Sequence, residues 1–225
     1  MLNGNIQIFD NVTSLSFRIA TDILSLANKS INEKKIFRIV LAGGNSFLSI
    51  YKLLNEFHSE WKYWHIYLGD ERLLTKFNKH RNDNMIKKQF VRGLPIPKKN
   101  INFFRTDFGS KNVLRDYEIK ISKVPIFDLV LLGMGEDGHT ASLFPNRKKN
   151  FHLKLVNEHR SPKWPDRRIS LNYSTLNNSL NVYKVVCGSS KRNTFLKLLK
   201  GKKFPISYIN GKSEEWYVCS DCLIS

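Results

Sequence analysis

Apolar residues follow two alternating patterns along most of this chain. Short apolar runs, each suited to a buried strand, alternate with stretches in which apolar residues recur every three or four positions, as on one face of a helix. The runs predict strands at 37–42, 64–68, 101–104, 127–132, 168–171, 182–187 and 216–219, and the other stretches predict helices at 15–26, 46–57, 82–90, 111–121 and 190–200. Strands that alternate with helices form a parallel sheet covered on both faces. We therefore expect one α/β domain over residues 1–225.

The length and composition are those of a globular protein. Of the 225 residues, 41% are hydrophobic and 12% aromatic, which is enough for a sizeable core. The longest run without a polar side chain, 129–135, is far shorter than the roughly 20 residues of a membrane span. Asn3, Asn5 and Gln7 interrupt the apolar core that a signal peptide would need. We expect a cytoplasmic protein that has no membrane partner.

The net charge is unusually high. Lys and Arg number 37 against 19 acidic residues, which gives a formal charge of +18. Three explanations stay open: a drift in composition, the attraction of a small anionic substrate, and binding to nucleic acid. The sequence has no arginine-rich arm and no zinc-finger spacing, so nucleic acid is the least favoured partner.

The cysteines do not predict a disulfide framework or a metal site. Cys187, Cys219 and Cys222 form an odd set in a large chain. The last two form a C-x-x-C near the end of the chain, but no second pair completes a zinc site, and we interpret the spacing as chance. The histidines lie at unrelated points. We expect neither a metal nor another cofactor.

Four of the predicted strands end in residues that are unusual at such positions. Ligands of open parallel sheets bind outside the carboxyl ends of the strands. Gly43, Gly44, Asn45 and Ser46 follow one of these strands and open a helix, so their backbone N–H groups and the helix terminus can bind a phosphate. The loop lacks the lysine of a P-loop and the G-x-G-x-x-G of dinucleotide sites, and a purely structural turn remains an alternative.

Cationic side chains follow two further strand ends. Residues 69–72 read G-D-E-R, in which Arg72 can bind a phosphate through two N–H groups and Asp70 can orient a hydroxyl or another side chain. A surface turn with local ion pairs is the alternative interpretation. Lys191 lies in the first turn of a predicted helix, where its charge opposes the helix dipole, so an anion in front of it would relieve an electrostatic cost.

The loop that follows the strand at 127–132 contains the best candidate for a general base. It places His139 among three glycines and two residues after Asp137. An imidazole with an ordinary pKa near 6.5 is mostly neutral at pH 7 and can accept a proton from water. Together, the four strand ends indicate a phosphorylated small molecule and proton-transfer chemistry.

Five segments of the chain carry a resemblance to a known family. In chain order they read G-D-E-R (69–72), R-N-x-x-M (81–85), G-M-G-E-D-G-H-T-A-S-L-F-P (133–145), P-x-x-R-I (165–169) and G-x-x-K (188–191). In this order they resemble the glucosamine-6-phosphate isomerase/6-phosphogluconolactonase family. The family's G-G-S-T-P loop is here G-G-N-S-F (43–47), which still offers polar side chains beside the backbone donors.

The resemblance implies a fold, a reaction and roles for single residues. The fold is a three-layer α/β/α sandwich around a mostly parallel, Rossmann-like sheet. The reaction is hydrolysis of 6-phospho-D-glucono-1,5-lactone to 6-phospho-D-gluconate, the second step of the oxidative pentose phosphate pathway, without a cofactor. His139 would activate water. The phosphate would lie on Gly43, Gly44, Asn45, Ser46, Arg72 and Lys191, and the lactone would be positioned by Asp70, Asn82, Asp137, Gly138 and Arg168.

Other functions stay open from the sequence. A deaminase or isomerase of amino-sugar phosphates would share the fold, but its loop continues toward I-A-F-N-E after the G-H, where this chain has T-A-S-L-F (140–144). A non-catalytic module that binds a sugar phosphate or nucleic acid is the alternative from another class. The expected partner is a small phosphorylated sugar lactone, with no nucleic acid and no membrane, and we expect a monomer.

Overall fold

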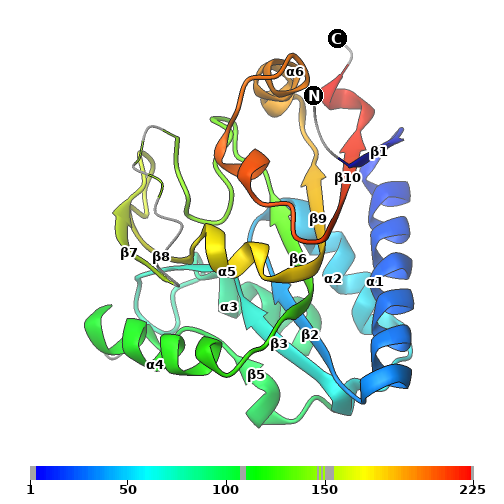
Figure 1. Cartoon of the computed structure of the whole chain (residues 1–225), viewed down its shortest axis with the longest axis vertical. Coiled ribbons are helices and arrows are strands. Elements are labelled where there is room, and N and C mark those ends of the chain that lie inside the picture. The colour runs from blue at the N-terminus through cyan, green and yellow to red at the C-terminus, as the bar shows by residue number, and fades with distance from the viewer. Residues whose placement is uncertain (1–3, 107–109, 146, 148, 150–154, 224–225) are drawn as a thin grey trace.

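A parallel sheet forms the centre of the molecule. The computed structural model describes residues 4–106, 110–145, 147, 149 and 155–223. Within this part of the chain, seven strands lie in the order β1 (Asn5–Phe9), β10 (Ser213–Cys219), β9 (Ser179–Val186), β6 (Phe127–Gly133), β2 (Phe37–Leu41), β3 (Trp64–Leu68) and β5 (Ile101–Asn102), as Figure 1 shows. Every neighbouring pair is parallel. This arrangement confirms the predicted α/β class.

The central strand β6 explains why the sheet needs cover on both faces. Its sequence FDLVLLG has a continuous apolar run, and its first six residues are all buried. Such continuous runs are typical of parallel strands between two layers, because neither side of the strand meets water. The polar member, Asp128, forms an ion pair with Lys34 and accepts a hydrogen bond from the backbone N–H of Arg38 at 2.7 Å.

Helices α1 (Val12–Lys34) and α2 (Leu48–Glu56) cover one face of the sheet. The first begins at Asn11, whose side chain accepts a hydrogen bond from the N–H of Ser14 at 2.9 Å, as an N-cap residue should. Its apolar residues return at helical spacing and are fully buried against the sheet: Leu15, Ile19, Ile23 and Ala27. The helix predicted at 15–26 is confirmed, and it is three residues longer at its start and eight residues longer at its end.

The opposite face carries α4 (Ser110–Ser122), α5 (Tyr173–Asn177) and α6 (Arg192–Leu199). Consecutive residues of β10 point to opposite faces, as in any strand. Tyr217 donates a hydrogen bond to Asp22 of α1 at 2.7 Å, whereas Trp216 packs against Phe195 of α6 with 6.1 Å between the ring centroids. The layers are therefore helices, sheet and helices, as the resemblance implied.

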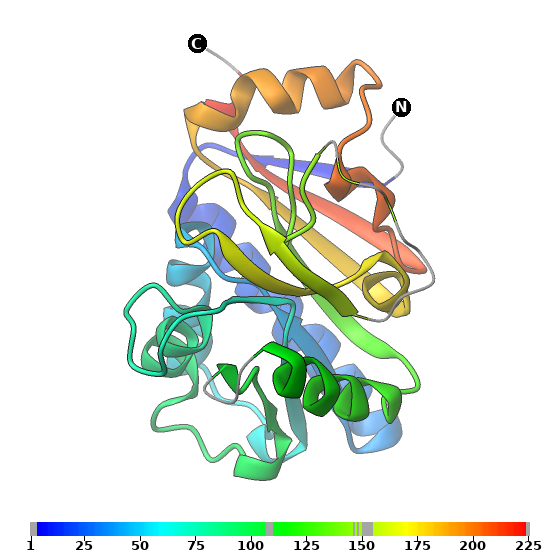
Figure 2. The same ribbon diagram turned by 90° about the vertical axis from the view of Figure 1, so that its left-hand side faces the viewer.

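A second sheet is the feature that the sequence did not predict. It is antiparallel, with the order β4 (Asp70–Arg72), β8 (Arg167–Leu171) and β7 (Leu155–Arg160), and Figure 2 shows it in front of the parallel strands. The predicted strand at 168–171 exists, but it belongs to this sheet. Strands β1, β4 and β7 were not predicted.

Two predicted elements differ in detail from the structure. The helix predicted at 82–90 consists of α3 (Asn82–Ile86) and a π-helical turn from Lys87 to Val91. The strand predicted at 101–104 keeps only the two residues of β5. None of the helices in the described residues is long and apolar enough to cross a membrane. A single domain over residues 1–225 stays a prediction.

Candidate active site

A cavity of about 750 Å³ opens at the carboxyl ends of β2, β6 and β9. This volume lies within the usual range of small-molecule sites, about 300–1,000 Å³. Strands β4 and β8 of the small sheet form one wall and contribute Asp70, Arg72 and Arg168. The predicted residues that line the cavity are Gly43, Gly44, Asn45, Ser46, Asp70, Arg72, Asn82, Asp137, His139, Arg168 and Lys191.

The loop after β6 presents an Asp–His pair to this cavity. Asp137 Oδ1 lies 2.5 Å from His139 Nδ1 and also accepts the backbone N–H of His139 at 3.1 Å. Because a carboxylate only accepts, the Nδ1 atom carries the proton and Nε2 is left as the acceptor. Partial burial raises the pKa of Asp137, but its hydrogen bonds with His139 and the imidazole charge outweigh this, and the net pKa is lowered.

Close packing fixes the position of the imidazole. The ring of Phe144 lies 4.8 Å from that of His139, centroid to centroid, and the His139 carbonyl accepts the N–H of Gly135 at 2.8 Å. A Cβ atom on Gly135 would lie only 2.1 Å from the ring of His139. Glycine at position 135 is therefore what lets the ring lie over this turn.

Lys191 and the glycine loop 43–46 lie close together at one end of the cavity, where β2 and β9 end. Gly44 has φ +100°, a conformation that favours glycine, and Lys191 Nζ lies 3.2 Å from Ser46 Oγ. Burial lowers the pKa of Lys191. No acidic side chain of the described residues forms an ion pair with Lys191, so an anion is the natural partner for this charge.

Two arginines lie side by side on the small sheet. Arg72 on β4 is the register partner of Arg168 on β8. Burial lowers the pKa of the Arg168 guanidinium, and the positive charge of Arg72 lowers it further. Arg168 Nε donates to the carbonyl of Pro165 at 2.7 Å, whereas Arg72 Nε is buried without a partner among the described residues. An anionic or strongly polar ligand would offset the repulsion between the two guanidinium charges and would give these side chains a hydrogen-bond acceptor.

Asp70 connects three parts of the site. One of its carboxylate oxygens accepts from Asn82 Nδ2 at 3.1 Å, and the other accepts from Ser142 Oγ at 2.6 Å. Asn82 begins α3, and Ser142 follows the glycine-rich loop, so the carboxylate fixes both elements relative to β4. Asn82 also contacts Gly43, where a Cβ atom would lie 2.0 Å from its Oδ1.

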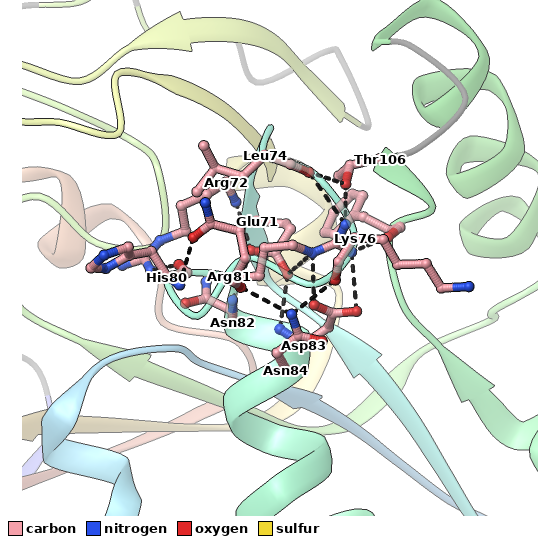
Figure 3. A network of polar contacts seen from close by, with 12 residues as sticks. Glu71, Arg72, Leu74, Lys76, His80, Arg81, Asn82, Asp83, Asn84 and Thr106 are labelled. Carbon is pink, nitrogen blue, oxygen red and sulfur yellow. Dashed lines mark hydrogen bonds and ion pairs between the residues drawn. The ribbon is translucent and has the colours of Figure 1, made fainter.

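Glu71 and Arg81 form a buried network behind the site, which Figure 3 shows. The carboxylate of Glu71 accepts three backbone N–H groups, from Arg72 at 2.7 Å and from Asn82 and Asp83 at 2.8 Å. Arg81 Nε donates to Asp83 at 2.8 Å and lies 3.9 Å from Glu71 Oε2. Burial and then the Asp83 charge raise the pKa of Glu71 to about 8, while the three N–H donors favour the ionised form. The glutamate of the G-D-E-R motif therefore holds α3 and lies outside the cavity lining.

The sequence did not identify one wall of the cavity. Residues 161–164, which belong to none of the motifs named above, line it together with Phe144. Lys163 forms an ion pair with Glu136 of the glycine-rich loop at 2.8 Å, and Trp164, 66% exposed, packs edge-to-face on His80. A proline-rich loop carries no chemical signature, so its place at the cavity could be found only from the fold.

Gly138 is the predicted site residue that the structure places elsewhere. It does not line the cavity, and its N–H donates to the carbonyl of Gly135 at 2.9 Å. With φ +84°, it makes the tight turn beneath His139 and packs on Phe204. In the described residues, no group of three or more histidine, cysteine or acidic side chains could hold a metal ion.

Comparisons with known proteins point to a single family. The chain is 31% identical over 204 residues to the 6-phosphogluconolactonase of Thermotoga maritima, covering 89% of this chain and 92% of that protein. It is 30% identical over 238 residues to the chloroplastic 6-phosphogluconolactonase 3 of Arabidopsis thaliana, covering 95% of this chain and 72% of that protein.

Solved structures agree with these matches. The crystal structure of the Thermotoga maritima 6-phosphogluconolactonase superposes with a TM-score of 0.90 at 28% identity, covering 96% of this chain and 100% of that one. The family described as glucosamine-6-phosphate isomerases/6-phosphogluconolactonase matches residues 10–218. With the sequence and the fold matched over almost its whole length, this chain belongs to the glucosamine-6-phosphate isomerase/6-phosphogluconolactonase family.

Proposed function

We propose that this protein hydrolyses 6-phospho-D-glucono-1,5-lactone to 6-phospho-D-gluconate. One observation carries the proposal: a single cavity holds both a histidine oriented by a carboxylate and two cationic groups, Arg72 and Lys191, that form no ion pair with an acidic side chain of the described residues. The relatives named 6-phosphogluconolactonase support the same substrate. A cytoplasmic location and a monomeric state stay predictions.

The Asp137–His139 pair supplies the base in this mechanism. Nε2 of His139 accepts a proton from water while the new hydroxide attacks C1 of the lactone. Asp137 holds the tautomer in which Nε2 is free and stabilises the imidazolium as it forms, because the Nδ1–H already points at its carboxylate. The proton then returns from His139 to the ring oxygen as the C1–O bond breaks, which opens the ring.

The cationic groups bind and orient the substrate. We assign the phosphate to Lys191, Arg72 and the loop 43–46, and the lactone to Asp70, Asn82 and Arg168. The oxyanion formed at C1 needs a hydrogen-bond donor. The N–H groups of Gly135 and Gly138 already bond inside their own loop, so we assign that role to Arg168, which faces the same cavity.

Acid release from freshly prepared 6-phosphogluconolactone tests the reaction directly, with the rate of unassisted ring opening subtracted. We expect His139→Ala to lower kcat by at least about 10²-fold, the usual scale for a lost general base. Formation of ammonia or fructose 6-phosphate from glucosamine 6-phosphate, with no lactone hydrolysis, would replace this proposal by the deaminase alternative.

A second experiment tests the phosphate assignment. Arg72→Ala and Lys191→Ala each remove a charge-assisted contact worth about 1.5–3 kcal/mol, so we expect KM to rise about 10- to 150-fold. The control substrate is unphosphorylated glucono-1,5-lactone, on which both variants should match the wild type. Equal losses on the two lactones would show that these side chains do not hold the phosphate.

A further inference from the structure

Three free thiols gather at the carboxyl ends of β9 and β10. Cys219 Sγ lies 3.0 Å from Cys187 Sγ, although 32 residues separate them in the sequence. Cys222 Sγ turns instead toward the carbonyl of Gly188 at 3.4 Å and toward Asp221 Oδ1 at 3.3 Å. The structure therefore pairs Cys219 with Cys187 on the neighbouring strand and not with Cys222 of the C-x-x-C.

The surroundings of this pair favour reaction with a small oxidant. The hydrogen bond between the two thiols lowers the pKa of Cys219, and the nearby Lys191 ammonium acts in the same direction. The same hydrogen bond and then burial raise the pKa of Cys187, so Cys219 is the more acidic of the two thiols. Cys187 lines the cavity, so a molecule as small as hydrogen peroxide can approach its thiol from there, whereas Cys219 is buried beside it.

We propose that Cys187 and Cys219 form a redox-active dithiol, which hydrogen peroxide oxidises to a disulfide. This disulfide weakens phosphate binding at Lys191, a consequence that rests on the function proposed above. One thiolate attacks the peroxide oxygen and becomes a sulfenic acid as the O–O bond breaks and the first water leaves. The other thiol attacks the sulfenic sulfur and releases the second water. The two thiols lose two electrons and two protons, and one peroxide becomes two waters.

The link to the phosphate site runs through a short turn. A disulfide needs its sulfur atoms about 2.05 Å apart, so the pair must close by roughly 1 Å from its present 3.0 Å. Cys187 is followed by Gly188, whose carbonyl accepts the N–H of Lys191 at 3.0 Å. Movement of Cys187 is therefore passed to Lys191 and to its contact with Ser46.

Peptide mapping tests the cross-link without reference to activity. The protein is treated with a small excess of hydrogen peroxide, alkylated, and digested with trypsin and Asp-N. Trypsin releases residues 185–191, and cleavage before Asp221 separates Cys219 from Cys222. We expect peptide 185–191 to be disulfide-linked to 213–220 and split from it by dithiothreitol. A link between Cys219 and Cys222, or alkylation of all three thiols after peroxide, overturns the proposal.

Enzyme kinetics then test whether the disulfide weakens phosphate binding at Lys191. We expect oxidised protein to show a KM for the phosphorylated lactone about three- to tenfold higher, reversed by dithiothreitol, because a shift of about 1 Å is costly to a charged contact. Cys222→Ser, the matched control, should respond like the wild type, and Cys219→Ser should not respond. An unchanged KM in cross-linked protein overturns the link to Lys191. A reduced protein that hydrolyses no lactone overturns the proposed function, while the mapping result still decides the dithiol.

Discussion

Replacement of Gly135 by alanine displaces the general base, His139, without changing the chemistry of its imidazole. The added Cβ atom would lie 2.1 Å from Cε1 and Nδ1 of His139, whereas carbon atoms in ordinary contact are about 3.5 Å apart. The ring must retreat by more than about 1 Å, which breaks its 2.5 Å bond to Asp137. Misplacement on this scale costs about 10²-fold, so we expect kcat to approach that of His139→Ala.

Stability should change little in the same variant. Gly135 does not have a positive φ, so alanine fits the backbone, and a partly exposed ring can turn toward solvent. We expect the free energy of unfolding to fall by about 1 kcal/mol, the low end for overpacking. Urea denaturation measures this, and acid release from fresh lactone measures kcat.

The matched control is Gly133→Ala, two residues earlier in the chain. Its Cβ atom would meet only the ring of Phe47, at 3.1 Å, so a shift of a few tenths of an ångström accommodates it. We expect its kcat to stay within about threefold of the wild type, since no catalytic group moves. A folded Gly135→Ala protein with a kcat as high as that of Gly133→Ala would refute the placement of His139.

Three further expectations follow from the site. Asp137→Asn should lower kcat about 10- to 50-fold with little change in KM, since it removes a charge-assisted bond that solvent partly screens; additive losses in the double variant with His139→Ala would contradict this. Glu71→Gln should lower the free energy of unfolding in urea by about 2–4 kcal/mol at pH 9, where Glu71 with its pKa of about 8 is ionised, because an amide group cannot accept all three backbone N–H groups; an unchanged midpoint would argue against the network. Turnover should survive EDTA, and loss of activity that zinc or magnesium restores would overturn the metal-free mechanism. Rising salt should lower kcat/KM more than kcat if the +18 charge attracts the anionic substrate.

The sequence predicted the parallel sheet well because buried strands carry a strong local signal. Trp64–Leu68 was predicted to the residue, and 127–132 to within one residue of β6. The small sheet was missed because β4 lacks such a signal, and the predicted strand at 168–171 does not itself show which sheet it joins. β4 has only the three residues Asp70–Arg72, all charged, and they form a strand because they pair with β8.

The sequence also predicted part of the candidate site, again because the residues concerned carry a local signal. Residues at strand ends, such as His139 and Lys191, could be found because parallel strands bring their carboxyl ends together. The roles of Glu71 and Gly138 could not be found, because a motif does not say which of its side chains face the ligand. Nor could the place of Trp164, which lies in the connection between β7 and β8 and reaches the cavity only through the fold of the small sheet.

The exposure of Trp164 also makes its fluorescence distinguishable from that of the other tryptophans. Of the four tryptophans, Trp61, Trp64 and Trp216 are at most 5% exposed, whereas Trp164 is 66% exposed at the mouth of the cavity. Indoles in water emit at longer wavelengths than buried ones, so the red edge of the emission spectrum comes from Trp164. A ligand that enters the cavity displaces water from this one ring and leaves the other three unchanged. Occupancy of the cavity can therefore be followed by intrinsic fluorescence, without a label.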